Sequence, residues 1–280
     1  MTARMEIWYA NYVGRSKQTA LFSEETDDEI MVNDLFITSV RIAEQLPENS
    51  YLRNLPVIKS LQAMERLNIT KRVTIIAGEN GIGKSTLIEA IAVHQGFNPE
   101  GGTVNFNFAT EDSHSELHRF LRIQKGTAVR RDGFFLRAES FYNVASNIDQ
   151  MDRIKATGPR VIGSYGGVSL HKQSHGESFM ALVENRFGGN GLYILDEPEA
   201  ALSPARMLEL ICHIHRLENM NSQFIISTHS PILMAYPGAE LLYLTQEGIQ
   251  SVSYRETEHY QLTKQFLDNP ERMFKYLFQE

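Results

Sequence analysis

Residues 78–86 combine glycines with a lysine and two hydroxyl side chains, a set that can hold a phosphate group. The stretch reads GENGIGKST and comprises Gly78, Glu79, Asn80, Gly81, Ile82, Gly83, Lys84, Ser85 and Thr86. Bare backbone can curl until successive N–H groups point at an anion. In the pattern G-x-x-x-x-G-K-[ST], the lysine reaches the β- and γ-phosphates and the Ser85 hydroxyl binds Mg²⁺. The sequence therefore predicts a site for a nucleoside triphosphate and magnesium.

Two carboxylates and a histidine follow other apolar segments. Asp196 and Glu197 come directly after the apolar residues of LYILDEPEAALS, and His229 follows QFIIST. We expect Asp196 to hold Mg²⁺ and Glu197 to polarise the water that attacks the γ-phosphate. The imidazole of His229 can hydrogen-bond to the γ-phosphate. These residues form the predicted catalytic and metal-binding groups.

The segments around these residues predict an α/β fold. Apolar runs at 73–76, 133–141, 191–195 and 223–228 are typical of strands, and 85–95, 177–187 and 205–217 have the apolar spacing of helices. Strands that alternate with helices favour a mostly parallel sheet flanked by helices. Open sheets of this kind bind ligands at the carboxyl ends of their strands, where the candidate residues lie.

The remaining segments complete a predicted single domain over residues 1–280. We expect N-terminal strands (5–13 and 31–40) and a helix (60–68) within 1–70, with antiparallel pairing. The nucleotide-binding core is predicted at 71–139 and 188–256, including a strand at 101–110, a helix at 114–124 and a strand pair at 240–244 and 248–254. A short helical subregion (140–187) and a C-terminal helix (257–280) complete the domain.

The composition is that of an ordinary globular protein. The chain has 280 residues, of which 42% are hydrophobic and 22% charged, and its one cysteine, Cys212, excludes an internal disulfide. Within a helical segment, Cys212 is expected to be a small buried hydrophobic residue. No apolar run has the length of a membrane helix, so we expect no membrane insertion and a cytoplasmic location.

Charge is distributed unevenly. The formal net charge is −7, yet residues 118–131 carry five basic side chains and no acid: Arg119, Arg122, Lys125, Arg130 and Arg131. Two interpretations stay open. The stretch is either a solvated helix face and turn, or a contact with a phosphate backbone or an acidic partner.

Together, these motifs resemble those of the ATP-binding-cassette (ABC) ATPases over about residues 71–245. GENGIGKST resembles the Walker A loop, LYILDEP the Walker B motif with its catalytic glutamate, and AALS (200–203) the D-loop. STHS around His229 is similar to the switch-histidine loop. The resemblance implies that the nucleotide is ATP, bound with Mg²⁺, and that the chain is an ATPase.

The family's signature LSGGQ is replaced here by QSHGE, residues 173–177. Ser174 and Gly176 are kept, while Gln173 and His175 depart from the pattern. Glu177 in the last place is similar to the RecF/SMC-like branch. The resemblance implies that these residues contact the γ-phosphate bound to a second chain, which makes the ATP state a homodimer. Ser174 and Glu177 can also form a capping box at a helix start.

Two further family features have more than one candidate. A glutamine near the Mg²⁺ normally ends the strand before the helical subregion, and Glu139 takes that place here. Gln124 is the alternative, on a stretch that we predict to be helical. Trp8, Tyr9 and Tyr51 are candidates for stacking on adenine, although a core role is favoured for each.

The task coupled to ATP hydrolysis has three candidates. Nearly the whole chain resembles small stand-alone bacterial predicted ATPases. The Glu-ended signature and the basic stretch favour an ATPase that acts on DNA in repair, genome maintenance or phage defence. One alternative is the nucleotide-binding subunit of an ABC transporter. Another is a regulatory partner of an effector protein such as a nuclease.

Overall fold

The computed structural model describes residues 34–106, 115–154 and 161–278, all within the compact unit Val32–Glu280. The strand predicted over residues 5–13 lies outside the described residues, as do Trp8 and Tyr9. The organisation of residues 1–280 as a single domain stays a prediction.

A six-stranded sheet forms the centre of the described part of the chain. Its strand order is β5-β6-β7-β3-β8-β9. The strands from β5 to β8 in this order pair in parallel, and β9 is antiparallel to β8. The bounds are β3 (Val73–Gly78), β5 (Asp132–Arg137), β6 (Gly191–Asp196), β7 (Gln223–Ser227), β8 (Glu240–Leu244) and β9 (Ile249–Ser251).

The register of this sheet aligns the ends of the strands that carry the motifs. Every residue of β3, β6 and β7 is buried, as expected for apolar strands covered on both faces. Asp196 pairs with Ser227 of β7 on one side and with Arg137 of β5 on the other. The loop that follows β3 therefore lies at the carboxyl ends of the parallel strands, on the same side of the sheet as Asp196 and Ser227.

A second sheet of three antiparallel strands has the order β2-β1-β4. Its strands are β1 (Ser39–Ile42), β2 (Leu67–Asn68) and β4 (Leu121–Gln124), and η2 (Tyr51–Asn54) and α2 (Pro56–Ala63) lie between β1 and β2 in the chain. An antiparallel sheet is therefore present, but β1 overlaps the predicted strand 31–40 only at its last two residues. β2 lies at the end of the predicted helix 60–68, and β4 comes from a later part of the sequence.

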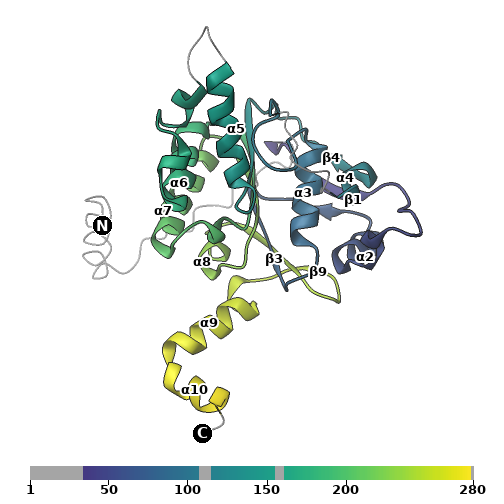
Figure 1. The fold of residues 1–280 in the computed structure, drawn as a ribbon. Coiled ribbons are helices and arrows are strands. Elements are labelled where there is room, and N and C mark those ends of the chain that lie inside the picture. Colours follow the sequence, from purple (N-terminus) through teal and green to yellow (C-terminus); the bar gives the residue numbers. More distant parts are fainter. Residues whose placement is uncertain (1–33, 107–114, 155–160, 279–280) are drawn as a thin grey trace. The chain divides into compact units, whose positions relative to one another are not determined.

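Helices cover the main sheet on both faces. α5, α6 and α7 lie together on one side, and α3 lies with β1 and β4 on the other (Figure 1). The helices are α3 (Lys84–His94), α4 (Leu117–Phe120), α5 (Phe141–Ile154), α6 (His175–Arg186), α7 (Pro204–Glu218), α8 (Pro231–Met234), α9 (Glu258–Asp268) and α10 (Pro270–Phe278). Short 3₁₀ turns join them: η3 (Val161–Tyr165), η4 (Leu170–Lys172), η5 (Pro198–Ala200) and η6 (Tyr254–Glu256). The predicted α/β fold, a mostly parallel sheet flanked by helices, is confirmed.

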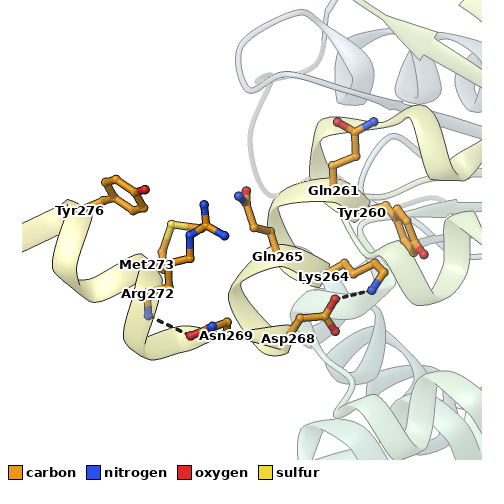
Figure 2. A pocket seen from close by; sticks show the side chains of 9 residues that line it. All are labelled: Tyr260, Gln261, Lys264, Gln265, Asp268, Asn269, Arg272, Met273 and Tyr276. Atoms are coloured by element: carbon orange, nitrogen blue, oxygen red, sulfur yellow. Dashed lines mark hydrogen bonds and ion pairs between the residues drawn. The ribbon is translucent and has the colours of Figure 1, made fainter.

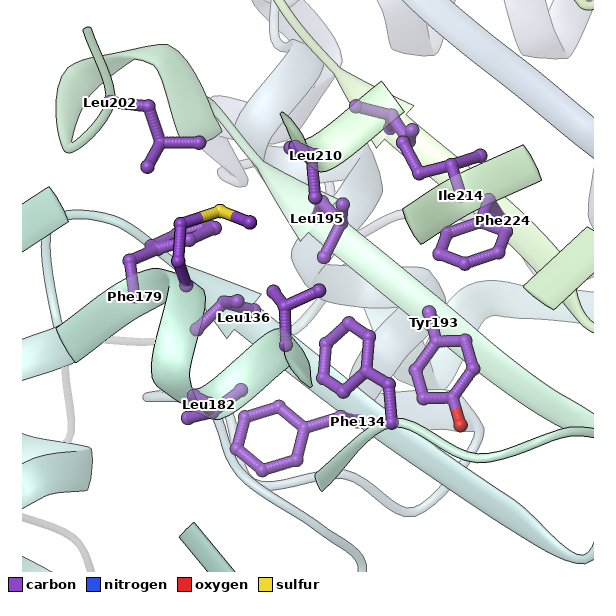
Figure 3. Close-up of a cluster of buried hydrophobic side chains, with 14 of the residues drawn as sticks. Phe134, Leu136, Phe179, Leu182, Tyr193, Leu195, Leu202, Leu210, Ile214 and Phe224 are labelled. Carbon is purple, nitrogen blue, oxygen red and sulfur yellow. The ribbon is translucent and has the colours of Figure 1, made fainter. Parts of the chain in front are cut away.

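The main core lies between the sheet and the helices α6 and α7. Tyr193 and Leu195 of β6 contact this cluster, with Phe179 of α6 and Leu210 of α7, and all four side chains are fully buried (Figure 3). The Phe187 and Tyr193 rings stack with centroids 4.1 Å apart. This packing fixes β6, which carries Asp196 and Glu197 at its end.

Several predicted elements differ from the structure. The helix predicted at 114–124 is only the turn α4, followed by strand β4. The cause is tertiary, because β4 pairs with β1 and alternates buried and exposed residues. Residues 101–106 form no strand beyond an isolated bridge between Gly102 and Phe135, and 107–110 lie outside the described residues.

Proline explains two other differences. The helix predicted at 60–68 begins earlier, with Pro56 in its first turn, and ends at Ala63. The predicted C-terminal helix is two helices, α9 and α10, divided before Pro270, which has no N–H to continue the first one. The helix α5 within residues 140–173 was not predicted as a separate element. No described helix is long and apolar enough to span a bilayer.

Candidate active site

The loop between β3 and α3 has a backbone that glycine alone fits well. Gly78 has φ +143°, and a Cβ there would lie 2.2 Å from the carbonyl oxygen of Leu244. Gly83 has φ +102°, and its Cβ would lie 2.5 Å from Cγ1 of Val57. Other side chains would meet both a left-handed backbone and a steric clash at these positions. The predicted glycine-rich loop is therefore held between β8 and α2.

Lys84 is folded back across this loop. Its Nζ donates hydrogen bonds to the carbonyl oxygens of Gly78, at 3.0 Å, and Glu79, at 2.7 Å. Burial lowers the pKa of Lys84, while the charges of Glu197 and Asp196 oppose that shift. The ammonium group is thus hydrogen-bonded within the same loop that would surround a phosphate.

Asp196 is the most enclosed carboxylate of the site, with 3% of its surface exposed. Ser227 and Ser85 both hydrogen-bond to it. Burial raises the pKa of the Asp196 carboxyl, and the hydrogen bond from Ser227 and the charge of Arg137 oppose the shift. Asp196 therefore joins the end of β6 to the first turn of α3, as the motif spacing predicts.

The pair of Ser85 and Asp196 fits magnesium. A hydroxyl and a carboxylate are oxygen donors of the kind that Mg²⁺ uses, and Mg²⁺ sites commonly include few protein ligands, with water and phosphate oxygens completing the shell. Among the described residues, no group of three or more His, Cys, Asp or Glu could hold a metal on its own. This donor set would fit a metal whose remaining ligands come from water and a nucleotide.

Glu197 and His229 face each other. Glu197 has a left-handed backbone, with φ +48°, and its N–H donates to the Ser227 carbonyl oxygen at 3.1 Å. A non-glycine residue rarely adopts this conformation, which is frequent at functional sites. Its Oε1 lies 3.5 Å from Nε2 of His229. The structure thus brings together the two residues that we predicted to be catalytic.

His229 is surrounded by further titratable groups. Its backbone N–H donates to the Glu199 carboxylate, and its ring Nδ1 lies 3.0 Å from Nε2 of His259 in α9. Burial and then the charges of Lys84 and His259 lower the pKa of His229 to about 4. The imidazole is consequently neutral at neutral pH.

Three residues of this site were missed by the sequence analysis: Arg137, Glu199 and His259. Glu199 follows Glu197 in the same motif, so the sequence could have predicted that it lies near the site. Arg137 is the residue of β5 that pairs with Asp196, which only the strand order reveals. Its guanidinium lies 3.3 Å from Asp196, 2.6 Å from Glu89 and 3.7 Å from Glu139.

The two candidates for the glutamine of the family pattern occupy different places. The Glu139 side chain is 78% exposed and lies within an ion-pair distance of Arg137. Its metal role stays a prediction. Gln124 ends β4 in the small sheet, where its Oε1 accepts a hydrogen bond from Ser39 Oγ at 3.3 Å. The helix that we predicted for Gln124 was wrong, for the pairing reason given above.

The signature residues form the predicted capping box. Oε2 of Glu177 accepts from Ser174 N at 3.0 Å and from Ser174 Oγ at 2.7 Å at the start of α6. These hydrogen bonds with Ser174 lower the pKa of Glu177. In the described structure, the hydrogen bonds of both side chains remain within this turn. Gly176, between them, is close to the Ala201 carbonyl oxygen, at 3.4 Å from an added Cβ.

The five basic side chains of residues 118–131 have different surroundings. Arg130 packs its guanidinium 5.0 Å from the Phe97 ring centroid and donates to the Gln95 carbonyl oxygen. Arg119 pairs with Glu116 at 3.0 Å. Lys125 and Arg131 are exposed. Arg122 instead lines a surface hollow of about 600 Å³ together with Arg41 and Arg66.

Two other predicted placements are resolved. Tyr51 is 60% exposed in η2, so the core role favoured for it was wrong. Cys212 is exposed on α7, not buried as expected. It lies two residues from the buried Leu210 and Ile214, which places it on the opposite face of the helix.

A separate hollow lies on α9 and α10. It has a volume of about 450 Å³, and Figure 2 shows the nine side chains around it, among them Tyr260, Lys264, Met273 and Tyr276. Lys264 pairs with Asp268 along α9. None of the predicted nucleotide-binding residues lines this hollow.

Two parts of the chain match known families. Residues 57–144 match a family described as "AAA domain". Residues 168–235 match one described as "AAA domain, putative AbiEii toxin, Type IV TA system". The "Uncharacterized ABC transporter ATP-binding protein" of Haemophilus influenzae is 25% identical over 194 residues, covering 63% of this chain and 71% of the relative. The "Probable ATP-dependent transporter ycf16" of Cyanidium caldarium is 24% identical over 215 residues, covering 68% and 84%.

Among solved structures, cbiO1 from Clostridium perfringens, part of the ABC transporter complex cbiONQ, aligns with a TM-score of 0.47 and 15% identity. The alignment covers 88% of this chain and 100% of that one. The family matches and the curated relatives confirm the resemblance to the ABC-type P-loop ATPases. The match over 57–144 is consistent with the RecF/SMC-like branch.

Proposed function

We propose that this chain binds and hydrolyses Mg·ATP. One observation carries the proposal: Ser85, Asp196, Glu197 and His229 meet at the ends of three neighbouring strands, directly beside the glycine-rich loop. A phosphate held by that loop would lie within reach of a lysine, a carboxylate and a neutral histidine. The matched AAA and ABC-type relatives support ATP as the nucleotide.

Each residue has a separate role in this proposal. Lys84 leaves the carbonyl oxygens of Gly78 and Glu79 and binds the β- and γ-phosphates. Glu197 accepts a proton from the attacking water. His229, neutral because of its lowered pKa, donates a hydrogen bond to the γ-phosphate. Ser85 and Asp196 would hold Mg²⁺, with Glu139 a candidate for its water shell, and the ion would neutralise charge on the phosphate oxygens.

We further propose that hydrolysis requires two chains. Ser174 and Glu177 cap α6. Within the described residues, neither side chain is hydrogen-bonded to the glycine-rich loop of its own chain. In a two-fold dimer, the residues Ser174, Gly176 and Glu177 of each chain would close the site of the other, with ATP between them. The capping box would hold the Ser174 hydroxyl at the helix start, ready for this contact.

Isothermal titration of ATP tests the nucleotide site. Lys84→Ala is expected to abolish measurable binding, because phosphate affinity depends on this charge and the loop amides. Lys59→Ala removes an exposed lysine of α2 and serves as the matched control, with unchanged affinity. Unaltered ATP affinity of the Lys84→Ala chain would remove the loop from the proposal.

The partner coupled to hydrolysis has two candidates with support. The names of the two curated relatives, an ABC transporter ATP-binding protein and an ATP-dependent transporter, support the role of a transporter's nucleotide-binding subunit. A task in DNA repair, genome maintenance or phage defence has no support from the comparisons. A regulatory role beside an effector protein stays a prediction, as does a cytoplasmic location.

DNA binding is favoured by one feature of the small sheet. Arg41 of β1 and Arg122 of β4 are directly opposite each other, and both line the hollow with Arg66 and a single acid, Glu65. Like charges in opposing positions cost stability unless an anion lies between them. A phosphate backbone would be such an anion. This hollow replaces the predicted continuous stretch 118–131 as the proposed contact.

A gel-shift series distinguishes the two candidates. Alanine at Arg41, Arg66 and Arg122 is expected to weaken DNA binding strongly and to reduce its dependence on salt. Arg119→Ala is the control, because Glu116 already pairs with that charge. No shift of the unaltered chain at any salt concentration would leave the transporter role as the supported one.

A further inference from the structure

A chain of polar groups runs from β8 through α9 to the predicted catalytic residues. Tyr243 Oη lies 3.5 Å from Nδ1 of His259, and Nε2 of His259 lies 3.0 Å from Nδ1 of His229. On its other side, Nε2 of His229 lies 3.5 Å from Oε1 of Glu197. The two histidine rings are 5.2 Å apart between centroids. His259 lies outside every motif that predicted the site.

Both imidazoles in this chain are neutral at neutral pH. Burial and the charge of Lys84 lower the pKa of His259 below its ordinary value, although Glu258 opposes the shift, and the same two causes act on His229. Burial, with Glu258 and Glu79, raises the pKa of Tyr243, so its phenol keeps the proton. A neutral imidazole has one N–H and one bare nitrogen, so each ring must donate on one side and accept on the other.

Only one direction gives every contact a donor and an acceptor. A carboxylate oxygen only accepts, so a hydrogen on Nε2 of His229 makes its 3.5 Å approach to Glu197 attractive. Nδ1 of His229 then accepts from Nε2–H of His259. Nδ1 of His259 is left as an acceptor for the phenol of Tyr243. The reverse arrangement would aim a lone pair of His229 at the carboxylate.

We propose that His259 is a positioning residue that holds His229 in the Nε2–H tautomer. The role of this tautomer in hydrolysis rests on the proposed function, since Nε2–H is the group that would reach the γ-phosphate. In histidines generally, the hydrogen bond made by one ring nitrogen decides which nitrogen carries the proton. His259 supplies that hydrogen bond from α9.

The tautomer can be measured without nucleotide. Two-bond ¹H–¹⁵N correlation spectra of the histidine-labelled full chain at neutral pH distinguish the nitrogens, and His229→Gln assigns the signal. The unaltered chain is expected to show His229 as Nε2–H. His259→Leu should give a mixture of tautomers, and His259→Gln should restore Nε2–H because its amide can donate. An Nδ1–H signal in the unaltered chain, or an unchanged tautomer in His259→Leu, would overturn the proposal.

A second variant keeps the test decisive if the leucine chain does not fold. His259→Glu places a carboxylate, which only accepts, against Nδ1 of His229. The expected result is the opposite tautomer, Nδ1–H, and an unchanged Nε2–H signal would overturn the proposal. The chain's circular dichroism spectrum establishes that it is folded.

Kinetics test the consequence for the reaction. His259→Leu should lower kcat about tenfold or more, as expected when a histidine loses its orienting partner, while the Kd for ATP stays within about twofold. His259→Gln should recover most of the rate, and equal kcat values for the unaltered and leucine chains would overturn the role in hydrolysis. Failure of the unaltered chain to bind ATP would instead overturn the proposed function and leave the tautomer result untouched.

Discussion

Nε of Arg137 lies 3.3 Å from Oδ2 of Asp196, and the other end of the same guanidinium is paired with Glu89 at 2.6 Å. The Arg137 side chain is 20% exposed, so the charges interact with little screening. A cation therefore already stands beside the carboxylate that we expect to hold Mg²⁺. Arg137 offsets the buried charge of Asp196 and would share this carboxylate with a metal bound there.

Arg137→Gln is expected to destabilise the chain most when magnesium is absent. Removing one partner of a buried ion pair costs about 3 to 5 kcal/mol, because Asp196 and Glu89 lose their counter-charge. Saturating Mg·ATP should restore part of that loss, since the metal then compensates Asp196. Urea unfolding with and without Mg·ATP measures both values.

Arg186→Gln is the matched control for this prediction. Arg186 pairs with Asp132, at the opposite end of β5, at 2.8 Å. Its loss should destabilise the chain by a similar amount, with the ordinary stabilisation by Mg·ATP and no additional recovery. An equal response of the two variants to Mg·ATP would contradict a special relationship between Arg137 and the metal.

Glu197→Gln should bind ATP, leave it intact and hold the chain as a dimer. Glutamine keeps the shape of the side chain but cannot accept the proton from water. Light scattering with Mg·ATP should therefore give twice the monomer mass, while thin-layer assays show no product. A monomer at micromolar concentration with saturating ATP is the outcome that would exclude a homodimer of this chain alone.

Ser174→Arg should leave ATP binding intact but prevent the second chain of the dimer from closing the site. The side chain stands at the exposed start of α6, so a larger charged group there leaves the chain's own P-loop untouched. We expect ATP affinity within about twofold of the unaltered chain and hydrolysis lowered at least about tenfold. Full activity in this variant would mean that the signature residues take no part in the reaction.

Acidification should destabilise the chain through His229. Its pKa is about 4 in the folded state, against an ordinary value of 6.5, so the unfolded chain binds more protons between these values. The free energy of unfolding then rises with pH across that window, and lowering the pH from about 7 to about 5 should cost about 2 kcal/mol. The titratable groups around His229 are Lys84, Glu197 and His259 near its ring and Glu199 at its backbone N–H.

His229→Gln isolates this contribution. The glutamine side chain does not titrate, so the variant should lose about 2 kcal/mol less than the unaltered chain over the same pH interval. Urea unfolding at the two pH values gives the difference. Parallel pH curves for the two chains would show that His229 is not the group responsible.

The motif residues could be predicted because each follows a strand in the sequence. Lys84, Asp196 and His229 belong to continuous segments whose apolar runs identify β3, β6 and β7. The parallel sheet then brings the ends of these strands together without further information. The fold class and the meeting of Glu197 with His229 were predictable for the same reason.

The other site residues depend on neighbours that are remote in the chain. Arg137 reaches Asp196 only because β5 pairs with β6, and His259 reaches His229 only because α9 returns to the site. The secondary structure around Gln124 also depends on a remote neighbour. Its segment has helical spacing, but pairing with β1 makes it a strand. Local pattern cannot contain such information.

The position of His259 in α9 matters when the chain is shortened or when its activity is judged from motifs alone. A stop codon at position 258 would leave the glycine-rich loop, both acidic residues and His229 in place, and a motif search would still report a complete ATPase. That shortened chain would lack the donor that sets the proton of His229. Hydrolysis by the shortened chain would therefore be slowed, although every residue that a motif search inspects is still present.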